Sequence, residues 1–142
     1  MIKGKTMSEL VVGEKATFTK TITDADVRLF AQLSGDKNPM HLDEEYASTT
    51  RFKHRIAHGH YVASMFSTIL GTQLPGEGCI YLSQEMKYVA PVYLNDTITA
   101  TAEVTEKNIE RNRVVISTTS TNQDGVVVIK GQAVVMPRKD NA

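Results

Sequence analysis

The chain has 142 residues, of which 41% are hydrophobic and 23% charged, and this length is enough for one domain with a real core. Its 16 basic and 16 acidic residues give a formal net charge of zero, which argues against nucleic acid or an anionic membrane as the main partner. The one cysteine, Cys79, excludes an internal disulfide and a cysteine metal site, and the N-terminus lacks the apolar run of a signal peptide, so we expect a cytoplasmic protein.

The first third of the chain predicts one strand and short helices. Residues 14–22 are β-prone and partly alternating, which is typical of a strand. Thr23 can then cap a helix that Gly35 would end. Asn38-Pro39 favours an extended or turn geometry, since the residue before proline avoids the helical region. Asp43 can cap a further short helical piece.

A long helix follows, and the rest of the chain is organised around it. Residues 56–76 contain no Asp, Glu, Lys or Arg, and their bulky side chains recur at helical spacing while the other faces carry small residues. A helix of this kind is enclosed on most sides. It is too short to span a membrane, which requires about 20 apolar residues. We predict a buried helix from about His58 to Thr72.

Beyond this helix the hydrophobic period changes from 3.6 to 2, which predicts strands. They cover residues 79–89, 97–107, 113–123 and 126–136. Pro91 indicates a bend or bulge at the end of the first strand. Asp124-Gly125 is a strong signal for a two-residue hairpin loop between the last two strands. The chain ends, residues 1–8 and 137–142, are expected to be loose tails.

Helices in the first half and consecutive strands in the second indicate an α+β fold with an antiparallel sheet. One long buried helix beside a long curved sheet suggests that the sheet wraps the helix. Such a sheet leaves open edges, and pairing of an edge with a second copy of the chain would cover one of them.

Two features of the sequence are candidates for chemistry. Asp36 and His41 flank a turn segment, where a carboxylate and an imidazole could hold one water, one group taking its proton and the other returning a proton to the substrate. Gly59 opens the buried helix, whose unpaired N–H groups could stabilise a carbonyl oxygen that gains negative charge. Each feature has a simpler explanation. Asp36 could cap a turn, His41 could be a loop histidine, and Gly59 could only permit tight packing.

In combination, these features resemble a known family. The segments S-G-D-K-N-P-M-H-L-D (34–43), I-A-H-G (56–59) and V-A-S-M-F-S (62–67) are similar to those of the (R)-specific enoyl-CoA hydratases, the MaoC-like branch of the hot-dog fold. The resemblance runs from about Thr23 to Met136. It implies a single hot-dog domain over residues 1–142, with the sheet wrapped around the central helix and short helices in an overhanging segment.

The resemblance also implies a reaction and its residues. The family adds water to a trans-2-enoyl-CoA to give the (R)-3-hydroxyacyl-CoA, uses no metal or redox cofactor, and typically forms a homodimer. Asp36 and His41 match its catalytic pair. Gly59 matches the helix-start glycine whose N–H stabilises the thioester oxygen, and Ser67 matches a serine on the central helix, for which packing alone is the alternative. His60 departs from the family, in which the residue after H-G is commonly apolar, and this affects the expected shape of the acyl pocket.

Other residues allow weaker interpretations. Arg51, Lys53 and Arg55 could meet the phosphates of coenzyme A, although such a cluster is more often solvated. The histidines near the helix start lack cysteine partners and have uncharged surroundings, so we expect no metal site there; His58 is expected to pack or hydrogen-bond. Cys79 has no evident activating partner and is expected to be a strand residue rather than a nucleophile.

Three other functions remain open from the sequence. Many thioesterases of the hot-dog fold, and the related carrier-protein dehydratases, place an acid on the central helix, and residues 56–76 contain none. A non-catalytic acyl-CoA-binding hot-dog would keep Gly59 but would have no reason to keep both Asp36 and His41.

Overall fold

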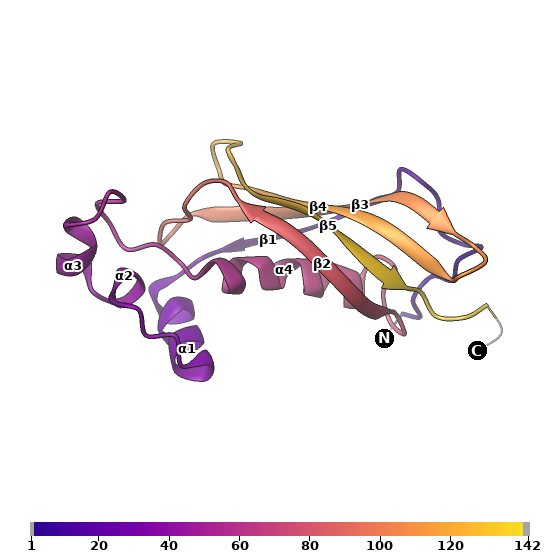
Figure 1. Cartoon of the computed structure of the whole chain (residues 1–142), viewed down its shortest axis with the longest axis horizontal. Helices are drawn as coiled ribbons and strands as arrows, with labels where there is room; N and C mark the ends of the chain where they lie inside the picture. The colour runs from indigo at the N-terminus through magenta and orange to yellow at the C-terminus, as the bar shows by residue number, and fades with distance from the viewer. Residues whose placement is uncertain (1, 141–142) are drawn as a thin grey trace.

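A computed structural model describes residues 2–140 as one antiparallel sheet with four helices (Figure 1). In chain order the elements are β1 (Lys15–Thr21), α1 (Asp24–Ser34), α2 (Pro39–Leu42), α3 (Glu44–Ser48), α4 (Gly59–Thr72), β2 (Ile80–Tyr88), β3 (Thr97–Asn108), β4 (Arg113–Thr121) and β5 (Val127–Met136). The strand order across the sheet is β1-β3-β4-β5-β2. The α+β prediction and the five predicted strands are therefore confirmed, with strand ends displaced by one or two residues.

The central helix α4 lies along the sheet, and α1 to α3 lie beyond one end of it, next to the start of α4 (Figure 1). Its bulky stripe is buried against the sheet: Val62, Met65, Phe66, Ile69 and Leu70. The apolar face of β3 packs against α4, and the residues of this strand alternate between partly and fully buried from Thr97 to Val104. Within residues 2–140, no helix has both the length and the apolar character needed to cross a bilayer.

Side-chain caps start the three short helices. Thr23 and Asp26 form a reciprocal capping box at α1, and Gly35 ends that helix in the left-handed conformation at φ 81°. Asp43 caps α3 as predicted. Asn38 avoids the helical region, at φ −53° and ψ 124°, as a residue before proline should. Its side chain, however, caps a one-turn helix, α2, where the sequence predicted only a turn. Proline at the first helical position explains the difference, since its fixed φ suits a helix start.

The loop between β4 and β5 is longer than predicted. Asn122 N–H bonds to Val126 O at 3.0 Å, so three residues rather than two form the turn. The Asn122 side chain accepts from the N–H groups of Asp124 (2.9 Å) and Val126 (3.1 Å) and favours this wider turn. Of the residues in this loop, only Gly125 has a positive φ, at 76°. A two-residue type I′ loop would need a positive φ at Asp124 as well.

The N-terminal segment is packed, so the prediction of a loose tail there is wrong for the described residues. Thr6, Met7 and Leu10 are buried. Thr6 also forms an isolated backbone β-bridge with Arg138, and the Arg138 side chain donates from Nε to Gly4 O. The chain ends pair with each other, and a contact between residues so far apart in sequence is not visible in the local pattern. Residues 1, 141 and 142, at the extremes of the predicted tails, lie outside the described part.

The two edges of the sheet are β1 and β2. β2 pairs with β5 on one side, and no strand within residues 2–140 pairs with its other side. This edge carries exposed apolar side chains: Ile80 (54% exposed), Leu82 (42%) and Tyr88 (47%). The strand ends at Tyr88, before the predicted bend at Pro91, and its one register irregularity lies at Tyr81/Ser83. An apolar edge left open in this way is a surface for strand pairing.

Candidate functional site

Asp36 and His41 are placed by the short helices. Gly35 turns the chain out of α1, and the Asp36 carboxylate then accepts from Asn38 N–H at 3.2 Å. Asn38 caps α2 through Met40 N–H at 3.1 Å, and His41 follows one turn later. The local hydrogen bonds thus hold the carboxylate and the imidazole on one compact turn, with Asp36 exposed and His41 half-buried.

The ring of His41 has a defined tautomer. Its Nδ1 lies 2.7 Å from Ile56 O, and because a carbonyl oxygen can only accept, Nδ1 is the donor. Nε2 of the neutral ring therefore keeps its lone pair. Burial lowers the pKa of His41 below its usual range, an effect opposed in part by the Ile56 carbonyl and by Asp36. A neutral imidazole with a free Nε2 can accept a proton.

His58 links these two residues, and the sequence predicted only that it packs or hydrogen-bonds. It is the N-cap residue of α4 and is buried, at 2% exposed. Its Nε2 donates to Asp36 O at 2.9 Å, and its ring stacks on that of His41 with centroids 3.9 Å apart. Ligand atoms of Asp36, His41 and His58 all lie within 4.8 Å of one another. One water can bridge groups at such separations.

The same three residues are the candidate metal ligands of residues 2–140. His58 contributes poorly, because its Nε2 is engaged with Asp36 O and its Nδ1 is enclosed, with no partner in the described part of the chain. Two open donors, from Asp36 and His41, are fewer than the three or four protein ligands typical of zinc sites. The donor set fits proton transfer better than metal binding.

The start of α4 differs from the other helix starts. Thr23, Asn38 and Asp43 cap α1, α2 and α3, but among the described residues no side chain caps the first turn of α4. Its N–H groups lie at the positive end of the dipole and lack partners within the helix. Gly59 also has a packing role, because a Cβ there would meet the Tyr88 ring at 2.5 Å.

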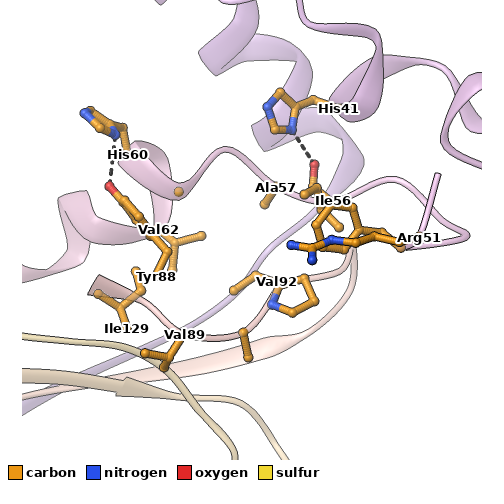
Figure 2. Close-up of a pocket in the computed structure, with 14 residues that line it drawn as sticks. His41, Arg51, Ile56, Ala57, His60, Val62, Tyr88, Val89, Val92 and Ile129 are labelled. Atoms are coloured by element: carbon orange, nitrogen blue, oxygen red, sulfur yellow. Dashed lines mark hydrogen bonds between the residues drawn. The ribbon is translucent and has the colours of Figure 1, made fainter. Parts of the chain in front are cut away.

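A cavity of about 360 Å³ opens at this helix start (Figure 2). Its lining includes His41, Gly59 and three buried aliphatic residues: Val62 of α4, Val92 of the connection between β2 and β3, and Ile129 of β5. Figure 2 shows His41 and Ile56 on one side of the cavity and His60 with Tyr88 on the other. The cavity therefore joins an imidazole, a helix N-terminus and apolar walls. Asp36 is not among the residues that line it.

The basic residues of segment 51–55 lie in different surroundings. Arg55, whose side chain is 12% exposed, donates to His41 O at 2.7 Å and to Asp24 Oδ1 at 2.6 Å, so it holds α2 against α1 instead of facing solvent. Arg51 lies over the Phe52 ring at 4.8 Å and lines the cavity. Lys53 is exposed. Of the three candidates for a phosphate contact, Arg51 is the one that lines the cavity.

Ser67 and Cys79 lie outside the cavity lining. Ser67 is exposed on α4, eight residues from Gly59, which is about 12 Å along a helix. Within one chain it does not meet Asp36 and His41. Cys79 is half-buried beside Leu70, to whose carbonyl its thiol donates at 3.0 Å, and burial raises its pKa. A raised pKa disfavours the thiolate that a nucleophile needs, and Cys79 lies one residue before β2 rather than in the predicted strand.

A family model, curated relatives and a solved structure all relate this chain to the same group of proteins. The profile of the family described as "MaoC like domain" matches residues 8–125. A Rhodospirillum rubrum protein named (R)-specific enoyl-CoA hydratase is 51% identical over 124 residues, 87% of this chain and 85% of that protein. A 3-hydroxybutyryl-CoA dehydratase of Methylorubrum extorquens is 42% identical over 135 residues, 94% of this chain and 85% of that protein. The solved structure of unliganded R-hydratase PhaJ1 from Pseudomonas aeruginosa matches with a TM-score of 0.91 at 44% identity, covering 96% of this chain and 88% of that one.

Proposed function

The chain belongs to the family of MaoC-like domain proteins with the hot-dog fold, and from that premise we propose that it is an (R)-specific enoyl-CoA hydratase. It adds water reversibly to a trans-2-enoyl-CoA and forms the (R)-3-hydroxyacyl-CoA. The observation that carries this proposal is the cavity at which His41 meets the uncapped start of α4. Hydration of an enoyl thioester needs a base for water and a partner for the thioester oxygen, and this cavity offers both.

Asp36 and His41 are the proposed catalytic pair. Water bound between them attacks C3 of the substrate, and one of its protons passes to the pair as the C3–O bond forms. The pair returns one proton to C2 as the enolate collapses, so protons balance over the cycle. His41 is our choice for the first acceptor, because its Nε2 lone pair is free and burial lowers its pKa. A positioned base of this kind contributes roughly 10²–10⁴-fold to the rate.

The N–H of Gly59 is the proposed partner of the thioester oxygen. Charge develops on this oxygen when water adds, and a fixed N–H at a helix start stabilises it without reorganisation. Such a donor contributes roughly 10²–10³-fold. The absence of a side-chain cap on α4 within residues 2–140 supports the assignment, since a cap would compete with the ligand. With acid, base and oxyanion donor supplied by the chain, we propose that no metal or redox cofactor takes part.

We further propose that the active form is a cytoplasmic homodimer in which residues 1–142 are one hot-dog domain. The exposed apolar edge of β2 supports pairing with the same strand of a second copy. Ser67 lies on the exposed face of α4, where such a partner could complete its environment, and we keep it as a substrate-binding residue on that basis. Sedimentation should give twice the 15.7 kDa of one chain, and Leu82→Lys on the open edge should shift the mass towards a monomer.

A direct assay tests the proposed reaction. The absorbance of the conjugated enoyl thioester should fall without release of free thiol, and chiral analysis should return the (R)-alcohol. Release of thiol would identify a thioesterase instead, although α4 carries no carboxylate for that chemistry. Binding of acyl-CoA with neither signal would identify a non-catalytic binding protein.

A further inference from the structure

Tyr88 and His60 form a pair on the cavity wall that the proposed mechanism does not use. The Tyr88 hydroxyl lies 2.9 Å from His60 Nδ1, and the two rings are nearly parallel, 22° apart, with centroids 6.1 Å apart. Both residues line the cavity. They come from different elements, His60 from the first turn of α4 and Tyr88 from the end of β2, so their hydrogen bond joins the helix start to the edge strand.

The position of the Tyr88 ring is closely defined. The ring lies directly against Gly59, where an added Cβ would fall 2.5 Å from Cε1. The hydrogen bond to His60 fixes its far end. Partial burial raises the pKa of the Tyr88 hydroxyl, so this group keeps its proton. A ring held at both ends is a rigid wall rather than a mobile side chain.

This wall lies opposite the candidate catalytic imidazole (Figure 2). Figure 2 shows Tyr88 and His60 facing His41 and Ile56 across the cavity, with Val62 and Ile129 beside Tyr88. These two aliphatic residues are buried, each 1% exposed. Val62 and Ile129 line the cavity together with Tyr88, so removal of the tyrosine ring would widen the space along their apolar surface that is open to an acyl chain.

We propose that Tyr88, held in place by His60, is a specificity-determining residue that restricts this enzyme to short acyl groups. The inference rests on the proposed hydratase function, because it takes the cavity as the place of the enoyl thioester. It identifies the preferred substrates as short-chain trans-2-enoyl-CoA thioesters. The aliphatic walls favour the binding of each added methylene group of the acyl chain. The Tyr88 ring limits the length of the chain that fits and so excludes the longer chains.

The test compares kcat/KM for trans-2-hexenoyl-CoA with that for trans-2-butenoyl-CoA. Tyr88→Leu removes the ring and should raise this ratio by roughly tenfold or more, the smallest effect expected per methylene in an apolar pocket. Tyr88→Phe and His60→Leu each break the hydrogen bond but keep the bulk. They should raise the ratio by similar, smaller factors, and the double variant should exceed neither, because both changes remove one interaction. Tyr46→Phe, an exposed tyrosine outside the cavity, is the matched control.

Two outcomes separate this inference from the proposed function. If the wild-type chain hydrates enoyl-CoA but all three variants keep its chain-length ratio, the role of Tyr88 is wrong and the hydratase assignment stands. If the wild type hydrates no enoyl-CoA, the function itself is wrong. Should Tyr88→Leu fail to fold, the other two variants decide the question, and the ratio of dissociation constants for hexanoyl-CoA and butanoyl-CoA gives a second readout without turnover.

Discussion

Replacing the Asp36 carboxylate by an amide tests the proposed catalytic pair most directly. The side chain is exposed, and its one hydrogen bond within residues 2–140 is that from Asn38 N–H at 3.2 Å. Asp36→Asn keeps an oxygen in place to accept that bond. We therefore expect a change in the free energy of unfolding of about 0.5 kcal/mol or less, typical of an exposed site. For a chain of this length such a change corresponds to about 2 °C in Tm.

The effect on turnover should be far larger. An amide can neither take up nor return a proton within the pair, and the loss of a positioned acid or base lowers the rate by roughly 10²–10⁴-fold. Asp36 also raises the pKa of His41 against the dominant lowering by burial. Its removal should therefore shift the acid limb of the pH–rate profile to lower pH. A purely structural residue would not cause this shift.

The measurement is the loss of enoyl-thioester absorbance between pH 5 and 9, with Tm recorded for each variant. Asp43→Asn is the control, because Asp43 belongs to the same segment and accepts a backbone hydrogen bond from Tyr46 N–H at 3.1 Å but lies outside the trio of Asp36, His41 and His58. It should retain wild-type turnover. Undiminished turnover by Asp36→Asn, with Tm unchanged, would refute the assigned role.

Three further predictions concern the oxyanion donor, pH and the core. Gly59→Ala should lower kcat/KM by displacing the Tyr88 ring. Gly59→Pro adds the same Cβ and also removes the N–H, so the further loss of kcat/KM in this variant, roughly 10²–10³-fold, measures the contribution of the N–H donor. Equal losses of kcat/KM in the two variants would contradict that role. Because the folded pKa of His41 lies below 6.5, the acid limb of kcat/KM should lie below that pH. The contribution of His41 to the free energy of unfolding should be complete above pH 6.5 and should fall as the pH drops towards the folded pKa, because the unfolded chain binds the proton first. If the free energy of unfolding of the wild type and that of His41→Gln change in parallel with pH, this prediction is wrong. Phe66→Ala, at a side chain with 0% exposure, should cost about 3–5 kcal/mol in a denaturant titration, and a loss under about 1 kcal/mol would mean that α4 is not tightly packed.

Local chemistry explains what could be predicted from the sequence. A cap such as Thr23 or Asp43 acts within three residues, and the burial of α4 follows from a stripe repeated along one stretch. The candidate residues Asp36 and His41 also lie within one turn segment, so a motif can identify them. Even here, competition between local preferences misled the prediction at Asp124-Gly125, because the Asn122 side chain stabilises a wider turn.

The tertiary structure decided how these parts meet. His58 bonds to a carbonyl 22 residues earlier, Arg55 to a carboxylate 31 residues earlier, and Tyr88 to a histidine 28 residues earlier. None of these partners follows from periodicity or capping, because each depends on which faces the packed sheet and helices bring together. The sequence by itself determined the family, every element except the one-turn helix α2, and the candidate groups of the site. Only the folded chain placed His58 against His41 and Tyr88 over Gly59, since packing of distant segments is what brings their side chains within reach.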